Sequence, residues 1–172
     1  MKPTSQCRAH SVACARPARR RFSNKALAGR RLTAAKIVVD LDPTHRVLRI
    51  TVMTALTDEA AKAIYQAVAR VASQGGPYAA ITDLSQVVDF PISADTIRTL
   101  AATASPIPLA GRTSVIVARQ PALFGLARMF EMHREAMGVQ LQVVHSLDEA
   151  YDLLEVTPED FTERLFPVDV AA

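Results

Sequence analysis

The residue types that could carry out catalysis or bind a metal are few in most of this chain. Beyond residue 36 there is no cysteine, and the histidines are His45, His133 and His145. No two of them stand at i and i+4 on one expected helix, the usual spacing of a helical zinc site. Nucleophilic catalysis would need one of them beside a nucleophile, whereas His45 falls in an expected turn and His145 closes an expected strand. We therefore expect no catalytic residues, no metal ligands and no cofactor.

The motifs that bind phosphates are absent from the sequence as well. It contains neither G-x-G-x-x-G nor G-x-x-x-x-G-K-[ST], and no G-x-S-x-G turn of the α/β-hydrolase type. Glu131 and Glu135 stand one helical turn apart, but Arg128 and Arg134 lie near them in the sequence. Opposite charges at this spacing predict an ion-paired helix face. We expect a non-enzymatic protein, with an enzyme of unknown class as the remote alternative.

The first 36 residues differ in composition from the rest of the chain. They contain ten of the 20 basic residues and none of the 17 acidic ones, so the remaining 136 residues carry a net charge of −7. Both cysteines are here, and Cys7, His10 and Cys14 supply three potential zinc ligands without a fourth. We expect reduced thiols in a basic, disordered tail, because large apolar residues are too sparse to bury a face.

The role of residues 1–36 stays open between three alternatives. They can be a tail without function or a misassigned start, an organelle transit peptide, or a basic arm that binds nucleic acid. They lack the apolar core of ~7–15 residues that a secretory signal needs. The negative charge of the rest argues against binding of duplex nucleic acid by that part, and no run of ~18 apolar residues could span a membrane. We expect a cytoplasmic protein.

Residues 37–156 alternate between strand and helix patterns. Apolar, β-branched runs predict strands at 37–41, 47–53, 78–84, 113–118 and 139–145. Helices are expected to start at capping residues or at a proline, namely Thr57, Ser93, Pro121 and Ser146. The order ββαβαβαβα predicts an α/β fold with an N-terminal hairpin, alternating helices and a mixed sheet of four to five strands. Residues 157–172 are expected to form a short C-terminal helix and a tail.

The expected helix from Pro121 to about Met137 has two contrasting faces. Its apolar stripe contains Ala122, Leu123, Leu126, Met129, Phe130, His133, Ala136 and Met137. The opposite face contains Phe124, Arg128, Glu131 and Met132. Aromatic, methionine and arginine side chains are enriched at the centres of protein interfaces. We therefore expect this face to bind a protein partner or a second copy of the chain.

Three stretches carry a resemblance to a known family. The strand ending in Asp83-Leu84-Ser85-Gln86-Val87, followed by a short link and a helix capped by Ser93, resembles the STAS domain of anti-sigma-factor antagonists. The stretch Phe124-Gly-Leu-Ala-Arg128-Met-Phe-Glu131 and the closing Ser146-Leu-Asp-Glu-Ala-Tyr-Asp-Leu-Leu resemble small bacterial SpoIIAA-like proteins of undefined function. The resemblance covers about residues 37–156 and implies a STAS-like fold.

The resemblance also implies a function. In the antagonists the link carries Asp-Ser-Ser-Gly or a close variant, with a phosphorylatable residue at the helix start. The matching residues here are Pro91-Ile92-Ser93-Ala94, so Ser93 is a candidate phosphoacceptor, although an ordinary N-cap accounts for it completely. The family implies a regulatory module that acts by partner binding or self-association. Related STAS-type and lipid-transfer folds imply the alternative of an apolar-ligand or nucleotide-binding module, which an apolar cavity would support.

Overall fold

The computed structural model describes residues 35–53, 55–73, 75–76, 78–103 and 111–170. The chain divides into two units, Met1–Arg31 and Leu32–Ala172, and all described residues belong to the second. The predictions for the basic tail, including those for Cys7, His10 and Cys14, lie outside the described residues.

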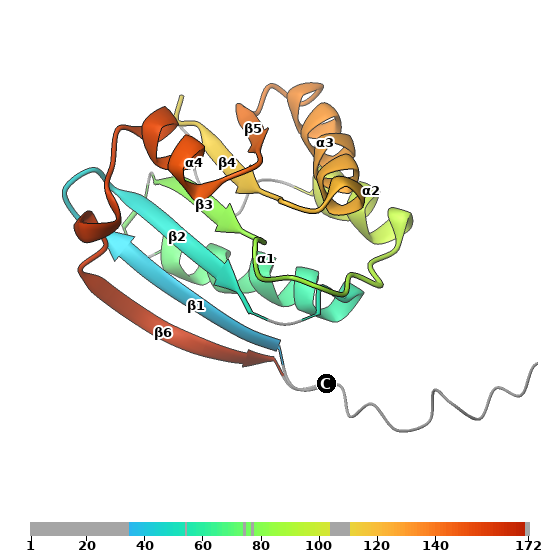
Figure 1. Cartoon of the computed structure of the whole chain (residues 1–172), viewed down its shortest axis with the longest axis horizontal. Coiled ribbons are helices and arrows are strands. Elements are labelled where there is room, and N and C mark those ends of the chain that lie inside the picture. Colours follow the sequence, from blue (N-terminus) through green and yellow to red (C-terminus); the bar gives the residue numbers. More distant parts are fainter. Residues whose placement is uncertain (1–34, 54, 74, 77, 104–110, 171–172) are drawn as a thin grey trace, which may run out of the picture. The chain divides into compact units, whose positions relative to one another are not determined.

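Six strands form one mixed sheet in the order β5-β4-β3-β2-β1-β6 (Figure 1). They are β1 (Ala35–Asp42), β2 (Val47–Val52), β3 (Ala79–Asp83), β4 (Ser114–Val117), β5 (Leu141–Val144) and β6 (Glu163–Val170). Strands β2 to β5 are parallel, whereas β1 pairs antiparallel with both β2 and β6. The helices are α1 (Asp58–Ala72), α2 (Ala94–Ala102), α3 (Pro121–Glu135) and α4 (Leu147–Leu154). The predicted α/β class and element order up to α4 are confirmed.

The C-terminal segment differs from the prediction, and the sheet has six strands rather than four to five. After α4 the chain makes a single 3-10 turn, Pro158–Asp160, and then adds β6 beside β1. The short acidic run that predicted a helix supports only this turn, in which Asp160 Oδ2 accepts hydrogen bonds from the backbone N–H (2.7 Å) and the hydroxyl (2.9 Å) of Thr157. Strand β6 lies at the sheet edge, where a proline such as Pro167 is tolerated.

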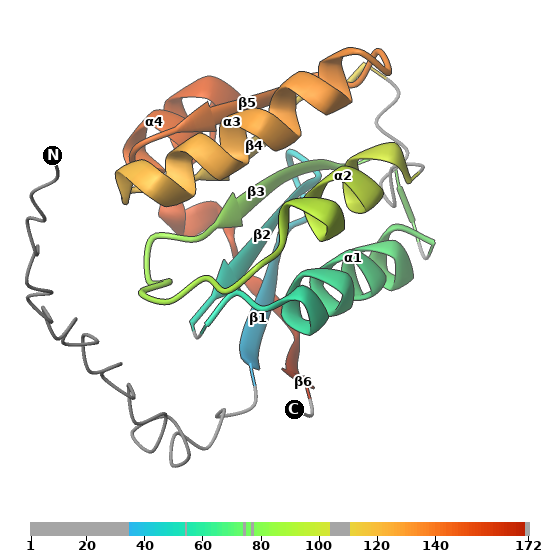
Figure 2. The ribbon, with the colours of Figure 1, turned by 90° about the vertical axis from the view of Figure 1, so that its right-hand side faces the viewer.

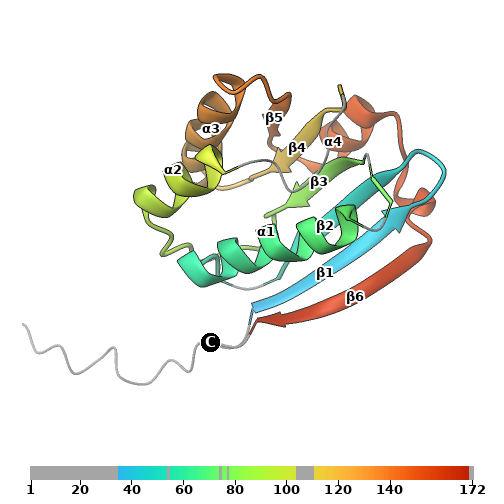
Figure 3. The same cartoon turned by 180° about the vertical axis from the view of Figure 1, so that it is seen from behind.

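The two faces of the sheet carry different helices. Helices α1, α2 and α3 cover one face and α4 lies on the other (Figure 2). The view from behind shows α1 in front of the strands (Figure 3). Side chains alternate between faces along a strand, so Leu48 and Ile50 of β2 pack with α1, whereas Val47 packs on the side of α4. Both faces of the sheet are therefore covered by helices.

Capping residues fix where the helices begin, as the sequence predicts. The hydroxyls of Thr57, Ser93 and Ser146 accept hydrogen bonds from the backbone N–H three residues on, at 3.1, 3.1 and 3.2 Å. Pro121 opens α3, where its missing N–H leaves no hydrogen bond unmade. Within the described ranges, no helix is both long enough and apolar enough to cross a membrane.

Candidate ligand-binding cavity

A partly enclosed cavity of about 180 Å³ lies between the sheet and helices α1, α2 and α3. Ile50 and Ile116 line it on the side of the sheet, and Ile64, Leu100 and Phe130 line it on the side of the helices. Among the described residues, the only polar side chains in its wall are those of Tyr65, Thr82, Ser114 and Arg134. The cavity is therefore a site for an apolar molecule with few polar groups.

Small side chains at three wall positions leave this space open. Ala61 of α1, Ala80 of β3 and Ala127 of α3 line the cavity, and all three are buried. A leucine or isoleucine at any of them would extend into the cavity and reduce its volume. The alternation of alanine with larger residues is compatible with both a filled and an unfilled core, so the sequence does not reveal the cavity.

Arg134 is the charged group in the wall, and only 3% of it is exposed. Its Nη1 donates hydrogen bonds to the carbonyl oxygens of Ala101 (3.1 Å) and Thr103 (2.7 Å), at the C-terminal end of α2. Helix C-termini present unsatisfied carbonyls and a partial negative charge, so a guanidinium is favourable there. The hydroxyl of Tyr65 donates to the same Thr103 carbonyl at 3.4 Å. Burial raises the pKa of Tyr65, an effect that the charge of Arg134 only partly opposes.

The orientation of α3 differs from the expected one. Its buried residues are Leu123, Ala127, Glu131 and Arg134, whereas four members of the expected apolar stripe, Ala122, His133, Ala136 and Met137, are exposed. Two charged residues can be buried because each has partners. Arg134 contacts the end of α2, and Glu131 forms an ion pair with Arg128.

The residues predicted as an interface on α3 fall into different environments. Met132 is 65% exposed and Arg128 is exposed, but Glu131 is buried. The ring of Phe124 is half-buried and stacks on the ring of His145, with centroids 4.0 Å apart and planes 12° from parallel. The structure therefore leaves Arg128 and Met132 as the accessible part of the predicted face.

Ser93 is exposed and caps α2, as expected. Its backbone N–H also donates a hydrogen bond of 2.7 Å to Oδ1 of Asp58. This bond, with smaller contributions from the side chains of Ser93 and Thr96, lowers the pKa of Asp58. The N-terminus of α2 would favour the negative charge of a phosphate on Ser93. The carboxylates of Asp58 and of Asp95, in the first turn of α2, would repel that phosphate. Phosphorylation of Ser93 stays a prediction.

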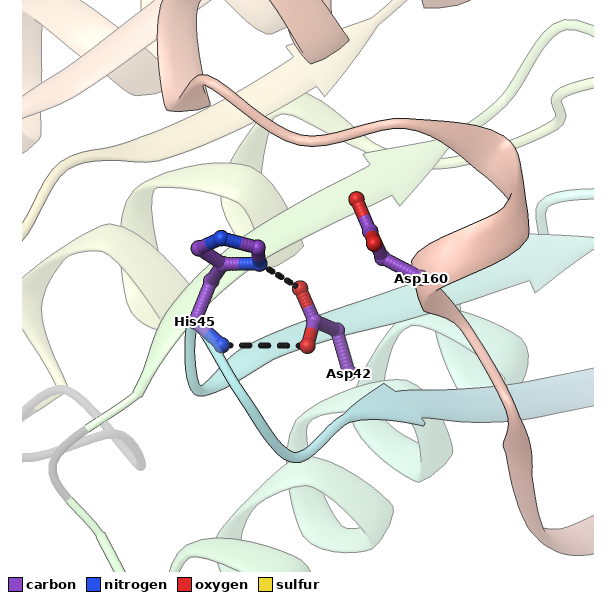
Figure 4. Close-up of side chains that lie close together, drawn as sticks. All are labelled: Asp42, His45 and Asp160. Atoms are coloured by element: carbon purple, nitrogen blue, oxygen red, sulfur yellow. Dashed lines mark hydrogen bonds and ion pairs between the residues drawn. The ribbon is translucent and has the colours of Figure 1, made fainter.

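Asp42, His45 and Asp160 form a cluster that the sequence does not predict (Figure 4). Asp42 is fully buried and accepts hydrogen bonds from the N–H groups of Thr44 (2.8 Å) and His45 (3.0 Å) and from His45 Nδ1 (2.6 Å). The hydrogen bonds from Thr157, followed by the charge of His45, lower the pKa of Asp160. Each carboxylate thus holds its own turn, Asp42 the β1–β2 hairpin and Asp160 the 3-10 turn. The cluster has a complete structural role.

Neither the models of known protein families nor the curated proteins match this sequence. The function has to follow from the geometry of the cavity and of the surface.

Proposed function

We propose that the protein is a non-enzymatic module that binds a small apolar ligand in the cavity between the sheet and α1, α2 and α3. The observation that carries the proposal is the apolar space of about 180 Å³. Protein interiors are close-packed, and voids larger than a water molecule are few in a domain. Engineered apolar cavities of about 150 Å³ stay dry and bind benzene. A ligand of about that size fits here.

The energetics of an unfilled cavity also support a ligand. Apolar side chains that line an unfilled space lack the dispersion contacts that they make in a close-packed core. A bound apolar molecule restores these contacts and removes apolar wall surface from water.

The chemistry of the wall supports binding rather than catalysis. Among the described residues that line the cavity there is no histidine, cysteine, aspartate or glutamate. General acid–base catalysis depends mainly on these groups, and a serine hydroxyl such as that of Ser114 needs one of them as a base to become a nucleophile. Arg134 is a permanent cation and cannot exchange protons at neutral pH. The residues present can hold and orient a molecule.

Toluene titrations monitored by NMR test the proposal. We expect toluene to shift resonances of residues around the cavity, such as Ile116 and Leu123, in a saturable manner. Ala127→Leu places an isobutyl group in the space and is expected to weaken toluene binding at least about tenfold. Ala122→Leu, an exposed position on the same helix, is the control and should bind as the unaltered chain does. The absence of saturable binding to the unaltered protein would rule the proposal out.

A second candidate function is the STAS-like one, a cytoplasmic regulatory module that self-associates through α3. It is favoured by the exposure of Met132 between the exposed residues Arg128 and Glu135. In a two-fold pairing of antiparallel α3 helices centred near Met132, Arg128 of one copy faces Glu135 of the other. Such an interface is self-complementary in charge and apolar at its centre.

Sedimentation analysis tests this second candidate. We expect Met132→Asp to shift a concentration-dependent dimer towards monomer by at least about tenfold in dissociation constant. Leu153→Asp, which changes an exposed apolar residue on α4, controls for the general effect of an added charge. A monomeric unaltered protein, or equal effects of the two variants, would exclude self-association through α3.

A further inference from the structure

The guanidinium of Arg134 lies in the wall of the cavity, and its neighbours accept hydrogen bonds from only some of its N–H groups. A guanidinium has five N–H donors. The two hydrogen bonds of Arg134 to described residues both come from Nη1, and within the described part of the chain Nη2 and Nε have no acceptor. With 3% of the residue exposed, little water is available to replace these partners. A buried charge without full pairing is costly.

The chain supplies no side-chain counter-ion for this guanidinium. No aspartate or glutamate of the described residues forms an ion pair with Arg134. The remaining positions, 1–34, 54, 74, 77, 104–110 and 171–172, contain neither aspartate nor glutamate. No aspartate or glutamate of the chain therefore completes the pairing, and an oxyanion of a ligand could do so.

The charged group of the cavity wall lies at one end of the cavity. Arg134 belongs to the last turn of α3, and its carbonyl accepts a hydrogen bond from Val139 just before β5. Arg134 therefore lies at the end of the cavity where β4 and β5 begin, together with Ser114. Leu84 follows β3 and Leu123 lies in the first turn of α3, so both line the opposite end. A molecule that is charged at one end fits this polarity.

We propose that the ligand is a small apolar carboxylate, with its carboxylate on Arg134 and its apolar body directed towards Leu84 and Leu123. The inference rests on the proposed ligand-binding function. Nη2 and Nε can form the two parallel N–H···O bonds that guanidinium and carboxylate groups prefer. By comparison with benzene in a cavity of about 150 Å³, the space accommodates roughly six to nine non-hydrogen atoms. Short fatty acids and simple aromatic acids belong to this class.

Calorimetric titrations of the full chain with matched ligands test the inference. Hexanoate is compared with hexan-1-ol, and benzoate with benzyl alcohol, so that each pair differs mainly in charge. We expect the carboxylate of at least one pair to bind about 10- to 100-fold more tightly than its alcohol, because hydrogen bonds to charged groups are the stronger ones. The pair with the greater difference distinguishes a linear from an aromatic ligand.

Arg134→Met assigns the preference to this residue. In this variant the carboxylate and its alcohol should bind within about threefold of each other, whereas Arg98→Met, an exposed arginine on α2, should retain the preference. Arg134 also binds the carbonyls at the end of α2, so its substitution could destabilise the fold. The comparison of carboxylates with alcohols on the unaltered protein does not depend on this variant.

The outcomes separate this inference from the function on which it rests. If the alcohols and the carboxylates bind equally well to the unaltered protein, the anionic ligand is excluded and the apolar site remains. If Arg134→Met keeps the preference, Arg134 is not the binding group. If neither toluene nor any of the four ligands binds, the proposed function itself fails.

Discussion

Glu131 shows at the scale of one residue how α3 accommodates charge at the edge of its buried face. Burial raises the pKa of its carboxyl group above the ordinary value of 4.5, and the opposing charge of Arg128 reduces this shift. The folded protein therefore binds a proton at Glu131 more tightly than the unfolded chain does. The stability associated with this group is fully present below about pH 4.5 and is lost as pH rises through the raised folded pKa.

Glu131→Gln is expected to remove this pH dependence. The free energy of unfolding of the variant, relative to that of the unaltered protein, should increase as pH rises from about 4.5 through the raised pKa of Glu131, because only the unaltered protein loses stability there. Urea unfolding at several pH values measures the difference. Glu155→Gln, at an exposed position after α4, controls for the loss of one negative charge. A difference for Glu131→Gln that is constant over this range would contradict the prediction.

Single residues also show what a sequence pattern can predict and what it cannot. Ser93 and the other capping residues act within one turn of the chain, so their roles follow from the sequence alone. Arg134 and Glu131 were expected on an ion-paired face, yet both are buried. The carbonyls of Ala101 and Thr103 satisfy part of the Arg134 guanidinium, and Glu131 pairs with Arg128. A hydrophobicity pattern assigns charged residues to water and contains no information about such partners.

At the scale of elements, β6 is attached to the sheet by more than its backbone. Asp40 of β1 accepts a hydrogen bond of 3.0 Å from Nε of Arg164 in β6 and one of 3.1 Å from Nη2 of Arg49 in β2. Arg49 also donates to the hydroxyl of Tyr151 in α4 at 2.9 Å, and its guanidinium lies 4.4 Å from the ring centroid of Phe161. One buried carboxylate thus connects three strands, and through Arg49 a helix as well.

Asp40→Asn is expected to lower the free energy of unfolding by about 1–3 kcal/mol, because two charge-assisted hydrogen bonds lose their anionic acceptor. Asp152→Asn changes an exposed position on α4 and should alter stability by less than about 0.5 kcal/mol. Urea denaturation followed by circular dichroism compares the two variants. Equal stability changes would show that the network around Asp40 contributes nothing specific.

The arrangement of the elements also explains why the sequence pattern predicted a short helix in place of β6. The turn residues after α4 resemble the start of a helix, and the run that follows contains Pro167, which weakens a strand prediction. This run forms a strand because its backbone pairs with the edge of β1 and because Arg164 donates a hydrogen bond to Asp40. That edge is provided by a strand at the other end of the domain, and no local pattern in residues 163–170 records it.

At the scale of the whole described unit, the layered α/β arrangement was predictable, whereas its cavity was not. Strand and helix patterns alternate regularly, and parallel crossovers follow from that alternation. The space beneath α1, α2 and α3 depends instead on how three helices pack against each other and on alanines such as Ala80 and Ala127. The meeting of Asp42 with Asp160 likewise depends on a contact between distant turns. Periodicity reports local conformation, and these features depend on packing.

The strand order has a consequence for how the protein assembles during its synthesis. The β1–β2 hairpin and the successive crossovers to β3, β4 and β5 can form as the chain leaves the ribosome, because each new strand joins the preceding one. Of the described strands, β6 is made last, and it pairs with β1, which is made first. The outer edge of β1 therefore stays open to other nascent chains until β6 has been made. Slow translation of the segment between α4 and β6 would prolong the time during which this edge can aggregate.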